Sequence, residues 1–258
     1  MGRLHLFEWE DFGWFPAVLR DAATAYLRRA VEVTGQARRL APKLREAIAA
    51  SRAERVVDLC SGGAGPVVEL ARALAAEGCH VPFLLTDLYP NEPAMAEAVR
   101  AAAGSITVER ESVDATRVPA RLTGMRTLFN AFHHFRPEVA SRILRDAVEA
   151  RQPIAVFEIV SRDPVILLGI LFSPAVVLLL MPTIRPRKAS WLLFTYVVPL
   201  VPLLVLWDGL VSCLRVYAPE ELSELVDGLP ANDYHWEIGR VSIGGPAKAT
   251  YLIGRPPA

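Results

Sequence analysis

The sequence has little cysteine, no excess of charge of either sign and no low-complexity linker. Its three cysteines are scattered, without a Cys-x-x-Cys pair or a nearby histidine pattern, which argues against a disulfide framework and against a zinc or other metal site. Lysine plus arginine and aspartate plus glutamate balance at 28 each, so no global positive field points to nucleic acid. A globular enzyme of the reducing cytoplasm is the broad class that remains.

The N-terminus also lacks a targeting pattern. The segment "MGRLHLFEWEDFGWF" carries acids and tryptophans where a signal peptide needs a basic start and an uninterrupted apolar core. Leu6 stands where a myristoylation signal requires Ser or Thr. We expect the aromatic residues of this segment either to form a lid over cofactor and substrate or to pack against the sheet. These residues are Phe7, Trp9, Phe12, Trp14 and Phe15.

The rest of the chain alternates between two hydrophobic periodicities. Residues 15–50 have apolar side chains three and four apart, as in helices. Strands are predicted at 55–60, 81–87, 105–114, 125–132 and 153–160, and helices at 66–78, 91–104 and 136–150. After 208 come a helix at 218–229 and two strands, 234–245 and 248–256, joined by a Gly-Gly-Pro turn. Such alternation predicts right-handed parallel crossovers, and the last two strands predict an antiparallel hairpin.

The predicted fold class is therefore α/β: a doubly wound, mostly parallel sheet with a C-terminal antiparallel hairpin, N-terminal helices and an inserted apolar helical hairpin. We divide the chain into an N-terminal helical cap (1–53), a cofactor-binding Rossmann-like core (54–164), the apolar hairpin (165–207), and a last helix with the closing strands of the core (208–258). Nothing in the sequence indicates an oligomeric state.

A glycine-rich turn follows the first predicted strand, in "VVDLCSGGAGP", residues 56–66. Ligands of doubly wound sheets bind outside the carboxyl ends of the strands, and glycines there let the backbone approach a ligand closely. Asp58 ends this strand, Asp87 ends the next one 29 residues later, and Asp114 follows the third. Three acids at three successive strand ends are hard to explain by packing alone. A nicotinamide-dependent oxidoreductase prefers an acid about 20 residues after the turn and is disfavoured by this spacing.

On these residues the chain resembles the class I S-adenosylmethionine-dependent methyltransferases, over about residues 54–160. In that family an acid-x-Gly-x-Gly-x-Gly loop, an acid ending the second strand and an acid after the third bind the methionine, ribose and adenine parts of the cofactor. Cys60 and Ala64 replace two of the family's glycines, but both are small, and we expect the turn still to hold S-adenosylmethionine. The resemblance implies that the cofactor is bound by Asp58, Cys60, Gly62, Gly63, Gly65, Asp87, Leu88, Asp114, Ala115 and Asn130.

The segment "NAFHHF", residues 130–135, is similar to the part of the family that follows the fourth strand and faces the substrate. Its two histidines, His133 and His134, are the candidate catalytic bases, because an imidazole titrates near neutrality. The structural alternative is that each histidine caps the following helix or covers the cofactor. Glu158 ends the fifth strand and is expected either to bind substrate or to be an exposed strand end.

Two apolar runs of about 17 residues lie between Val165 and Trp207 and flank the basic turn "PTIRPRKAS". Each run is at the short limit for crossing a bilayer and contains proline. A hairpin in the cytoplasmic leaflet, with Arg185, Arg187 and Lys188 near anionic headgroups, is favoured over two short spans or a buried pair. Just beyond, Asp208 and Arg215 are expected to form a salt bridge at the base of the hairpin, or to contact a substrate or headgroup.

The leading functional hypothesis is a methyltransferase on the cytoplasmic side of the membrane that acts on a small lipophilic substrate and contacts membrane lipid. The alternative is a non-catalytic, membrane-associated adaptor with a methyltransferase-like fold, to which the departures at Cys60 and Ala64 give some weight. The acceptor atom and the need for a general base stay open at this level.

Overall fold

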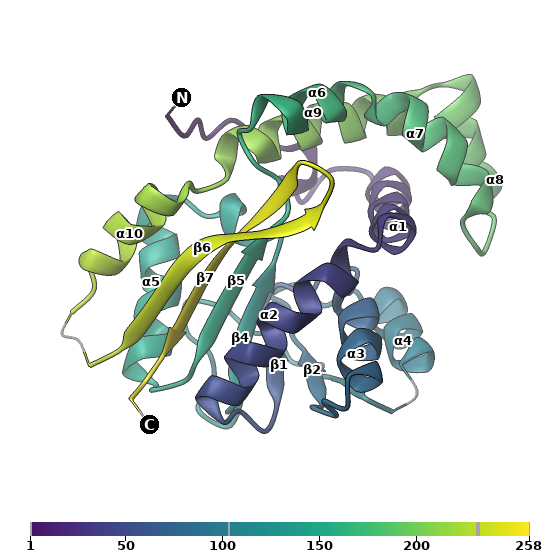
Figure 1. Ribbon diagram of the computed structural model, residues 1–258. Helices are drawn as coiled ribbons and strands as arrows, with labels where there is room; N and C mark the ends of the chain where they lie inside the picture. The colour runs from purple at the N-terminus through teal and green to yellow at the C-terminus, as the bar shows by residue number, and fades with distance from the viewer. Residues whose placement is uncertain (1, 103, 231–232, 258) are drawn as a thin grey trace. The chain divides into compact units, whose positions relative to one another are not determined.

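The computed structural model describes residues 2–102, 104–230 and 233–257, and its helices and strands are labelled in Figure 1. The chain divides into two compact units. One, here called the helical unit, comprises Met1–Thr34 and Val160–Val216. The other, here called the core unit, comprises Gly35–Ile159 and Tyr217–Ala258. Each unit is described by itself.

The core unit contains a seven-stranded sheet of order β3-β2-β1-β4-β5-β7-β6 in the part of the chain that the structure describes. The pairs among β1 to β5 are parallel, while β7 is antiparallel to both β5 and β6. This confirms the predicted fold class. The strands are β1 (Val56–Asp58), β2 (Phe83–Leu85), β3 (Ile106–Val108), β4 (Met125–Phe129), β5 (Ile154–Glu158), β6 (His235–Gly244) and β7 (Ala247–Arg255).

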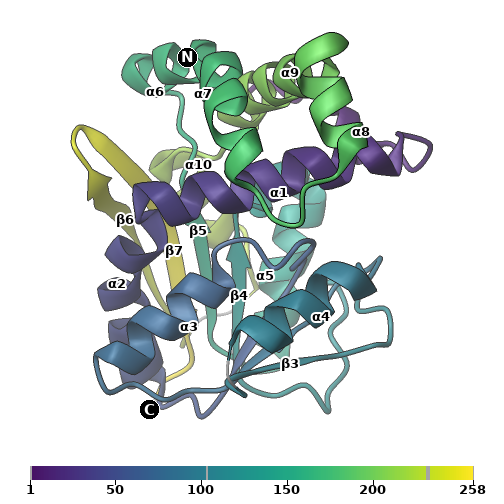
Figure 2. The ribbon, with the colours of Figure 1, turned by 90° about the vertical axis from the view of Figure 1, so that its right-hand side faces the viewer.

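Helices cover both faces of this sheet (Figures 1 and 2). On one face lie α2 (Gln36–Ser51), α3 (Val67–Ala76) and α4 (Glu92–Ala101). On the other lie α5 (Pro137–Glu149) and α10 (Pro219–Asp227), whose apolar residues join those of the strands in one buried cluster. Because both faces are covered, every residue of β1, β2, β4 and β5 is buried, including the polar side chains among them.

Some predicted elements are longer than those of the structure. The third strand ends at Val108, so residues 109–114 leave the sheet; β3 is an edge strand with a single neighbour, and Val113 instead donates its backbone N–H to the carbonyl of Asp87, at 2.9 Å. The fourth strand ends at Phe129, because Asn130 has a φ of +49° and turns the chain into the short helix η2 (Phe132–His134). The predicted helix 91–104 includes residue 103, which lies outside the described residues.

The helical unit is built from α1 (Ala17–Thr34) and the apolar segment that follows β5. Its elements are η1 (Trp9–Asp11), α6 (Pro164–Leu171), α7 (Ser173–Leu180), η3 (Met181–Thr183), α8 (Ala189–Leu192), η4 (Leu193–Val197) and α9 (Leu200–Arg215). Figure 2 shows α1 beside α7 and α9, and residues of α1, α7, α8 and α9 share one buried apolar cluster. The N-terminal helix and the apolar segment, far apart in sequence, thus form one body.

Neither apolar run is a single straight helix. The first bends by 51° between α6 and α7, and the second by 77° between η4 and α9. Proline explains the breaks, because it lacks an N–H and begins helices well: Pro174 lies in the first turn of α7, and Pro199 is the N-cap of α9. Among the described residues no single helix is long and apolar enough to cross a membrane, although each bent pair has sufficient combined length and composition.

The N-terminal aromatic segment is attached to α9 by polar contacts within the helical unit. The carboxylate of Asp208 accepts the backbone N–H groups of Trp9, at 2.9 Å, and Glu10, at 3.3 Å. Arg215, itself buried, forms ion pairs with Glu8 at 2.9 Å and Asp11 at 2.8 Å. The expected salt bridge between Asp208 and Arg215 was therefore wrong, because the N-terminal segment supplies each of them with partners. The contacts described here are with α9, so packing of this segment against the sheet and its role as a lid both stay predictions.

Candidate active site

The loop after β1 has the backbone conformation of a glycine-rich turn even where glycine is missing. Gly62 and Gly65 have φ values of +49° and +22°, while Cys60 and Ala64 have +58° and +63°. A residue with a side chain in this left-handed region costs about 1–2 kcal/mol. The substitutions at Cys60 and Ala64 have thus left the shape of the turn intact at the expense of local strain.

Asp58, at the end of β1, holds the start of this loop by hydrogen bonds. Its side chain is 2 % exposed and accepts the hydroxyl groups of Ser61, at 2.6 Å, and Thr127, at 2.8 Å. Burial raises the pKa of Asp58 to about 7, against the opposing effect of these two hydrogen bonds. The resemblance places Asp58 in the loop that binds the methionine part of the cofactor, and in the structure its side chain is bonded to two hydroxyl groups of the protein. The binding role of Asp58 stays a prediction.

Asp87 connects the end of β2 to the glycine loop. One carboxylate oxygen accepts the backbone N–H of Gly62 at 2.7 Å, and the other accepts that of Tyr89 at 2.8 Å. A Cβ added at Gly62 or Gly65 would meet no other atom within 4 Å, so space is open on that side of the loop. An open glycine turn next to a carboxylate fits a ligand that carries hydroxyl and amine groups, such as a nucleoside.

The third predicted acid also comes to this edge. Asp114 lies in the exposed loop after β3, where its side chain accepts the N–H and the hydroxyl of Thr116, both at 2.8 Å. Burial and the negative charges of Asp87, Asp58 and Asp114 raise the pKa of the Cys60 thiol. All three acids therefore raise the pKa of the same thiol in the loop, and the Cys60 thiol stays protonated. Of the neighbouring candidates, Leu88 is exposed and Ala115 is buried.

Asn130 joins the ends of β4 and β5. Its side-chain oxygen accepts the backbone N–H of Ile159 at 2.7 Å, and its own N–H donates to the carbonyl of Phe157 at 2.9 Å. Asparagine tolerates the positive φ found here better than most residues do. In this structure Asn130 positions the segment that carries the two histidines, and its predicted contact with a cofactor stays a prediction.

His133 and Glu158 form a buried pair at the ends of these two strands. Both side chains are 3 % exposed, and Nδ1 of His133 lies 2.7 Å from Oε2 of Glu158. A carboxylate only accepts hydrogen bonds, so Nδ1 carries the proton. The backbone N–H of His133 donates to the other oxygen of Glu158 at 3.1 Å. The predicted alternative of an exposed strand end at Glu158 was wrong, because β4 and β5 are neighbours and bring these two residues together.

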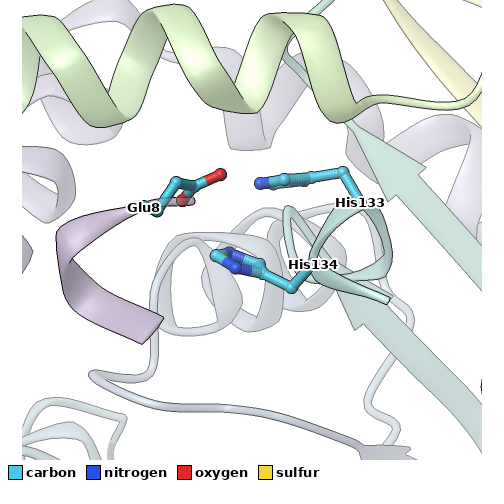
Figure 3. A group of neighbouring side chains, drawn as sticks. All are labelled: Glu8, His133 and His134. Atoms are coloured by element: carbon cyan, nitrogen blue, oxygen red, sulfur yellow. The ribbon is translucent and has the colours of Figure 1, made fainter. Parts of the chain in front are cut away.

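His134 lies next to His133 in η2, with the two ring centroids 4.4 Å apart (Figure 3). Glu8, also drawn there, belongs to the helical unit. Sequence reasoning missed Ser61 and Thr127 as partners of Asp58, although both lie near strand ends of the predicted carboxyl edge. Neighbouring parallel strands end at the same edge of a sheet. This rule could also have predicted that the residues at the ends of the fourth and fifth strands, among them His133 and Glu158, lie close together.

Comparisons with known proteins identify the fold. No model of a protein family matches the sequence, and neither does any curated protein. Solved structures do match. The pyocyanin biosynthetic protein PhzM is 17% identical, with 88% of this chain and 56% of that chain covered and a TM-score of 0.52. The mitomycin 7-O-methyltransferase MmcR is 16% identical, with 87% and 54% covered and a TM-score of 0.50.

The chain thus spans about half the length of these two structures. At these identities the likeness establishes the fold: the core unit has the doubly wound sheet of the S-adenosylmethionine-dependent methyltransferases, as the sequence predicted.

The buried carboxyl of Asp58 predicts a pH dependence of stability. Its folded-state pKa of about 7 exceeds that of an unfolded aspartate, about 4. The folded protein therefore holds a proton that the unfolded chain has released, and the stability this group contributes at low pH is lost as the pH rises from about 4 to about 7. Urea unfolding measures this: from about pH 4.5 to about pH 7.5 the free energy of unfolding of Asp58→Asn should fall less than that of the wild type, by about 3 kcal/mol. Asp114→Asn, at an exposed carboxylate, is the control and should behave as the wild type; equal losses in all three proteins would contradict the prediction.

Proposed function

We propose that this protein is an S-adenosylmethionine-dependent methyltransferase that acts on a hydroxyl group of a small lipophilic molecule at the cytoplasmic surface of a membrane. The observation that carries the proposal is the arrangement at the carboxyl edge of the core unit. There the loop held by Asp87 follows β1, and the buried pair of His133 and Glu158 follows the neighbouring strands β4 and β5. A cofactor loop and an oriented base on adjacent strand ends suit transfer to a protonated acceptor.

The residues of the edge fit the cofactor. The open side of Gly62 and Gly65 leaves room for the methionine part, and the carboxylates of Asp87 and Asp114 are acceptors for hydroxyl and amine groups. Leu88 and Ala115 lie beside them, where apolar contact with a base would fall. When bound, S-adenosylmethionine supplies a methyl group activated by a positively charged sulfur.

The residues that handle the proton are His133 and Glu158. The N–H at Nδ1 of His133 donates a hydrogen bond to Glu158, so the lone pair of the imidazole ring is on Nε2. His133 then takes the proton of the acceptor hydroxyl on Nε2, and the Glu158 carboxylate stabilises the resulting imidazolium. The O-methyltransferase activity in the name of MmcR, a structure of the same fold, agrees with an oxygen acceptor.

The helical unit supports the membrane part of the proposal. Residues 164–207 contain no Asp or Glu, and their cations are confined to one exposed turn, with Arg185, Arg187 and Lys188. The ammonium of Lys188 lies 4.4 Å from the ring centre of Trp191. Helix α6 is apolar yet has no buried residue, and large apolar side chains are also exposed on α7 and α9. Exposed apolar surface of this extent marks an interaction site, and the cations complement anionic headgroups.

The first test of the proposal is cofactor binding. Asp87→Ala removes the acceptor of the Gly62 N–H and the predicted ribose acceptor, so the affinity for S-adenosylhomocysteine should fall about 10- to 150-fold, equivalent to about 1.5–3 kcal/mol. Calorimetric titration measures it, with NAD titrated in parallel and expected not to bind. Glu77→Ala, after the end of α3 in the same unit, should leave affinity unchanged. Unaltered affinity in Asp87→Ala would count against the assigned site.

The second test concerns proton transfer. With a long-chain alkylphenol in anionic vesicles as acceptor probe, His133→Gln should lower the rate of methyl transfer about 100- to 10,000-fold, and Glu158→Gln should lower it too, both without loss of S-adenosylhomocysteine affinity. His80→Gln, at an exposed histidine of the core unit, is the matched control. Transfer at the wild-type rate by His133→Gln would remove His133 as the base. Cofactor binding with no methylated product in membranes of expressing cells would favour the adaptor.

The third test separates docking from spanning. Changing Arg185, Arg187 and Lys188 together to Gln should weaken binding to anionic vesicles by up to about 3 kcal/mol and scarcely affect neutral ones. A matched triple variant at Arg100, Arg142 and Arg145 removes the same charge from exposed positions of the core unit and should bind as the wild type does. The measurement is vesicle co-sedimentation over a salt series. If the wild type and the variant without Arg185, Arg187 and Lys188 both stay bound to vesicles at high salt, docking is ruled out and two short membrane spans are favoured.

A further inference from the structure

The helical unit contains an apolar pocket that neither the cofactor site nor the basic turn uses. Its volume is about 440 Å³, within the range of small-molecule sites. No lining side chain carries a charge, and half of them are aromatic. The lining residues are Phe7, Trp9, Phe15, Leu19, Leu200, Leu203, Leu204 and Trp207.

The walls of this pocket are held in place by the protein's own polar contacts. The indole N–H of Trp207 donates to the carbonyl of Phe7 at 3.1 Å, and the backbone N–H of Trp9 donates to Asp208 at 2.9 Å. Phe7 also packs edge-on against Trp9, with ring centroids 5.2 Å apart. The N-terminal segment is thereby fixed on α9 by contacts that need no ligand, so the pocket is preformed and ligand binding need not order it.

The pocket opens along one side of α9. Leu200, Leu203 and Trp207 lie three and four residues apart, on one face of the helix, and each remains substantially exposed. Leu204 and Phe15 form its buried floor. An open slot with an apolar floor and aromatic walls suits a flexible hydrocarbon chain that enters from the side.

A cation stands beside the apolar lining. The guanidinium of Arg20 lies 5.9 Å from the ring centre of Phe15 and donates to the carbonyl of Phe12 at 2.7 Å. By contrast, the carboxylate of Asp208, which follows the lining residue Trp207 in α9, is already engaged by backbone N–H groups. The charge next to Phe15 therefore complements an anionic head group attached to an apolar chain.

We propose that this pocket binds a single long-chain fatty acid, with its hydrocarbon chain between the N-terminal segment and α9 and its carboxylate beside Arg20. The proposal uses contacts of the helical unit alone and stands independently of the methyltransferase proposal. It also explains why the N-terminal segment is rich in aromatic residues, since Phe7, Trp9 and Phe15 line the pocket together with residues of α1 and α9.

The experiment titrates the full chain with monomeric oleate, its uncharged analogue oleyl alcohol, and dibromostearate, which quenches nearby tryptophans. Oleate should bind saturably with one site. Leu203→Arg should weaken it at least tenfold, whereas Leu168→Arg, in α6 outside the pocket, should change it less than twofold. The two leucines are 57 % and 56 % exposed, so neither change disturbs a core and the pair is matched.

Location and head-group position are tested separately. Trp207→Phe should reduce the tryptophan fluorescence that dibromostearate quenches while oleate still binds, and Trp236→Phe, in the core unit, should leave the quenched fluorescence unchanged. Arg20→Gln should weaken oleate at least fivefold more than it weakens oleyl alcohol.

Several results would overturn the proposal. Absence of saturable oleate binding, or equal weakening by Leu203→Arg and Leu168→Arg, would remove the pocket as the site. Equal effects of Arg20→Gln on the acid and the alcohol would remove the carboxylate contact. Quenching by vesicles of brominated phosphatidylglycerol but not by free dibromostearate would replace a fatty acid site with docking on a bilayer. Binding of S-adenosylhomocysteine, measured on the same samples, reports on the core unit and keeps the two proposals distinguishable.

Discussion

The buried carboxyl group of Asp58 is the contact on which the carboxyl edge of the core unit depends. Through Thr127 it joins β1 to β4, and through Ser61 it holds the start of the glycine loop, while the N–H of Ser61 donates to the carbonyl of Thr86 after β2. The side chain therefore links β1 and β4 to the loop, and the backbone of Ser61 extends the connection to the end of β2. Burying a carboxyl is costly unless it is hydrogen-bonded or neutral. Here two hydroxyls donate to it, and burial raises its pKa to about 7, so it takes up a proton more readily than an ordinary aspartate.

This anchoring explains how the loop keeps a glycine-like shape with Cys60 and Ala64 in it. Left-handed backbone at such residues persists only where the surroundings impose it. Here the surroundings are the bonds of Ser61 below the loop and the bond from Gly62 to Asp87 beside it. The strain marks the place where the chain holds a particular backbone shape, as expected of a segment shaped to bind a ligand.

The helical unit buries a few charged side chains and exposes many large apolar ones. Glu8, Asp208 and Arg215 are buried around the N-terminal segment, where Asp11 pairs with Arg215 from an exposed position, while large apolar side chains of α6, α7 and α9 are exposed. The buried charged groups are tolerated because each is hydrogen-bonded or ion-paired. Outward apolar groups are unfavourable in water unless something covers them. These exposed apolar side chains are the observation behind both the membrane proposal and the fatty acid proposal.

Local sequence patterns were enough to predict the doubly wound sheet, the glycine turn and the gathering of Asp58, Asp87 and Asp114 at one edge. These follow from local periodicity and from the rule that parallel strands end on the same side. Tertiary structure was needed to reveal that Asp208 accepts the backbone N–H of Trp9, 199 residues away. It also decided the bends in the apolar runs and the aromatic pocket on α9. The physical reason is that such contacts depend on which distant segments meet, and no local pattern of residues records that choice.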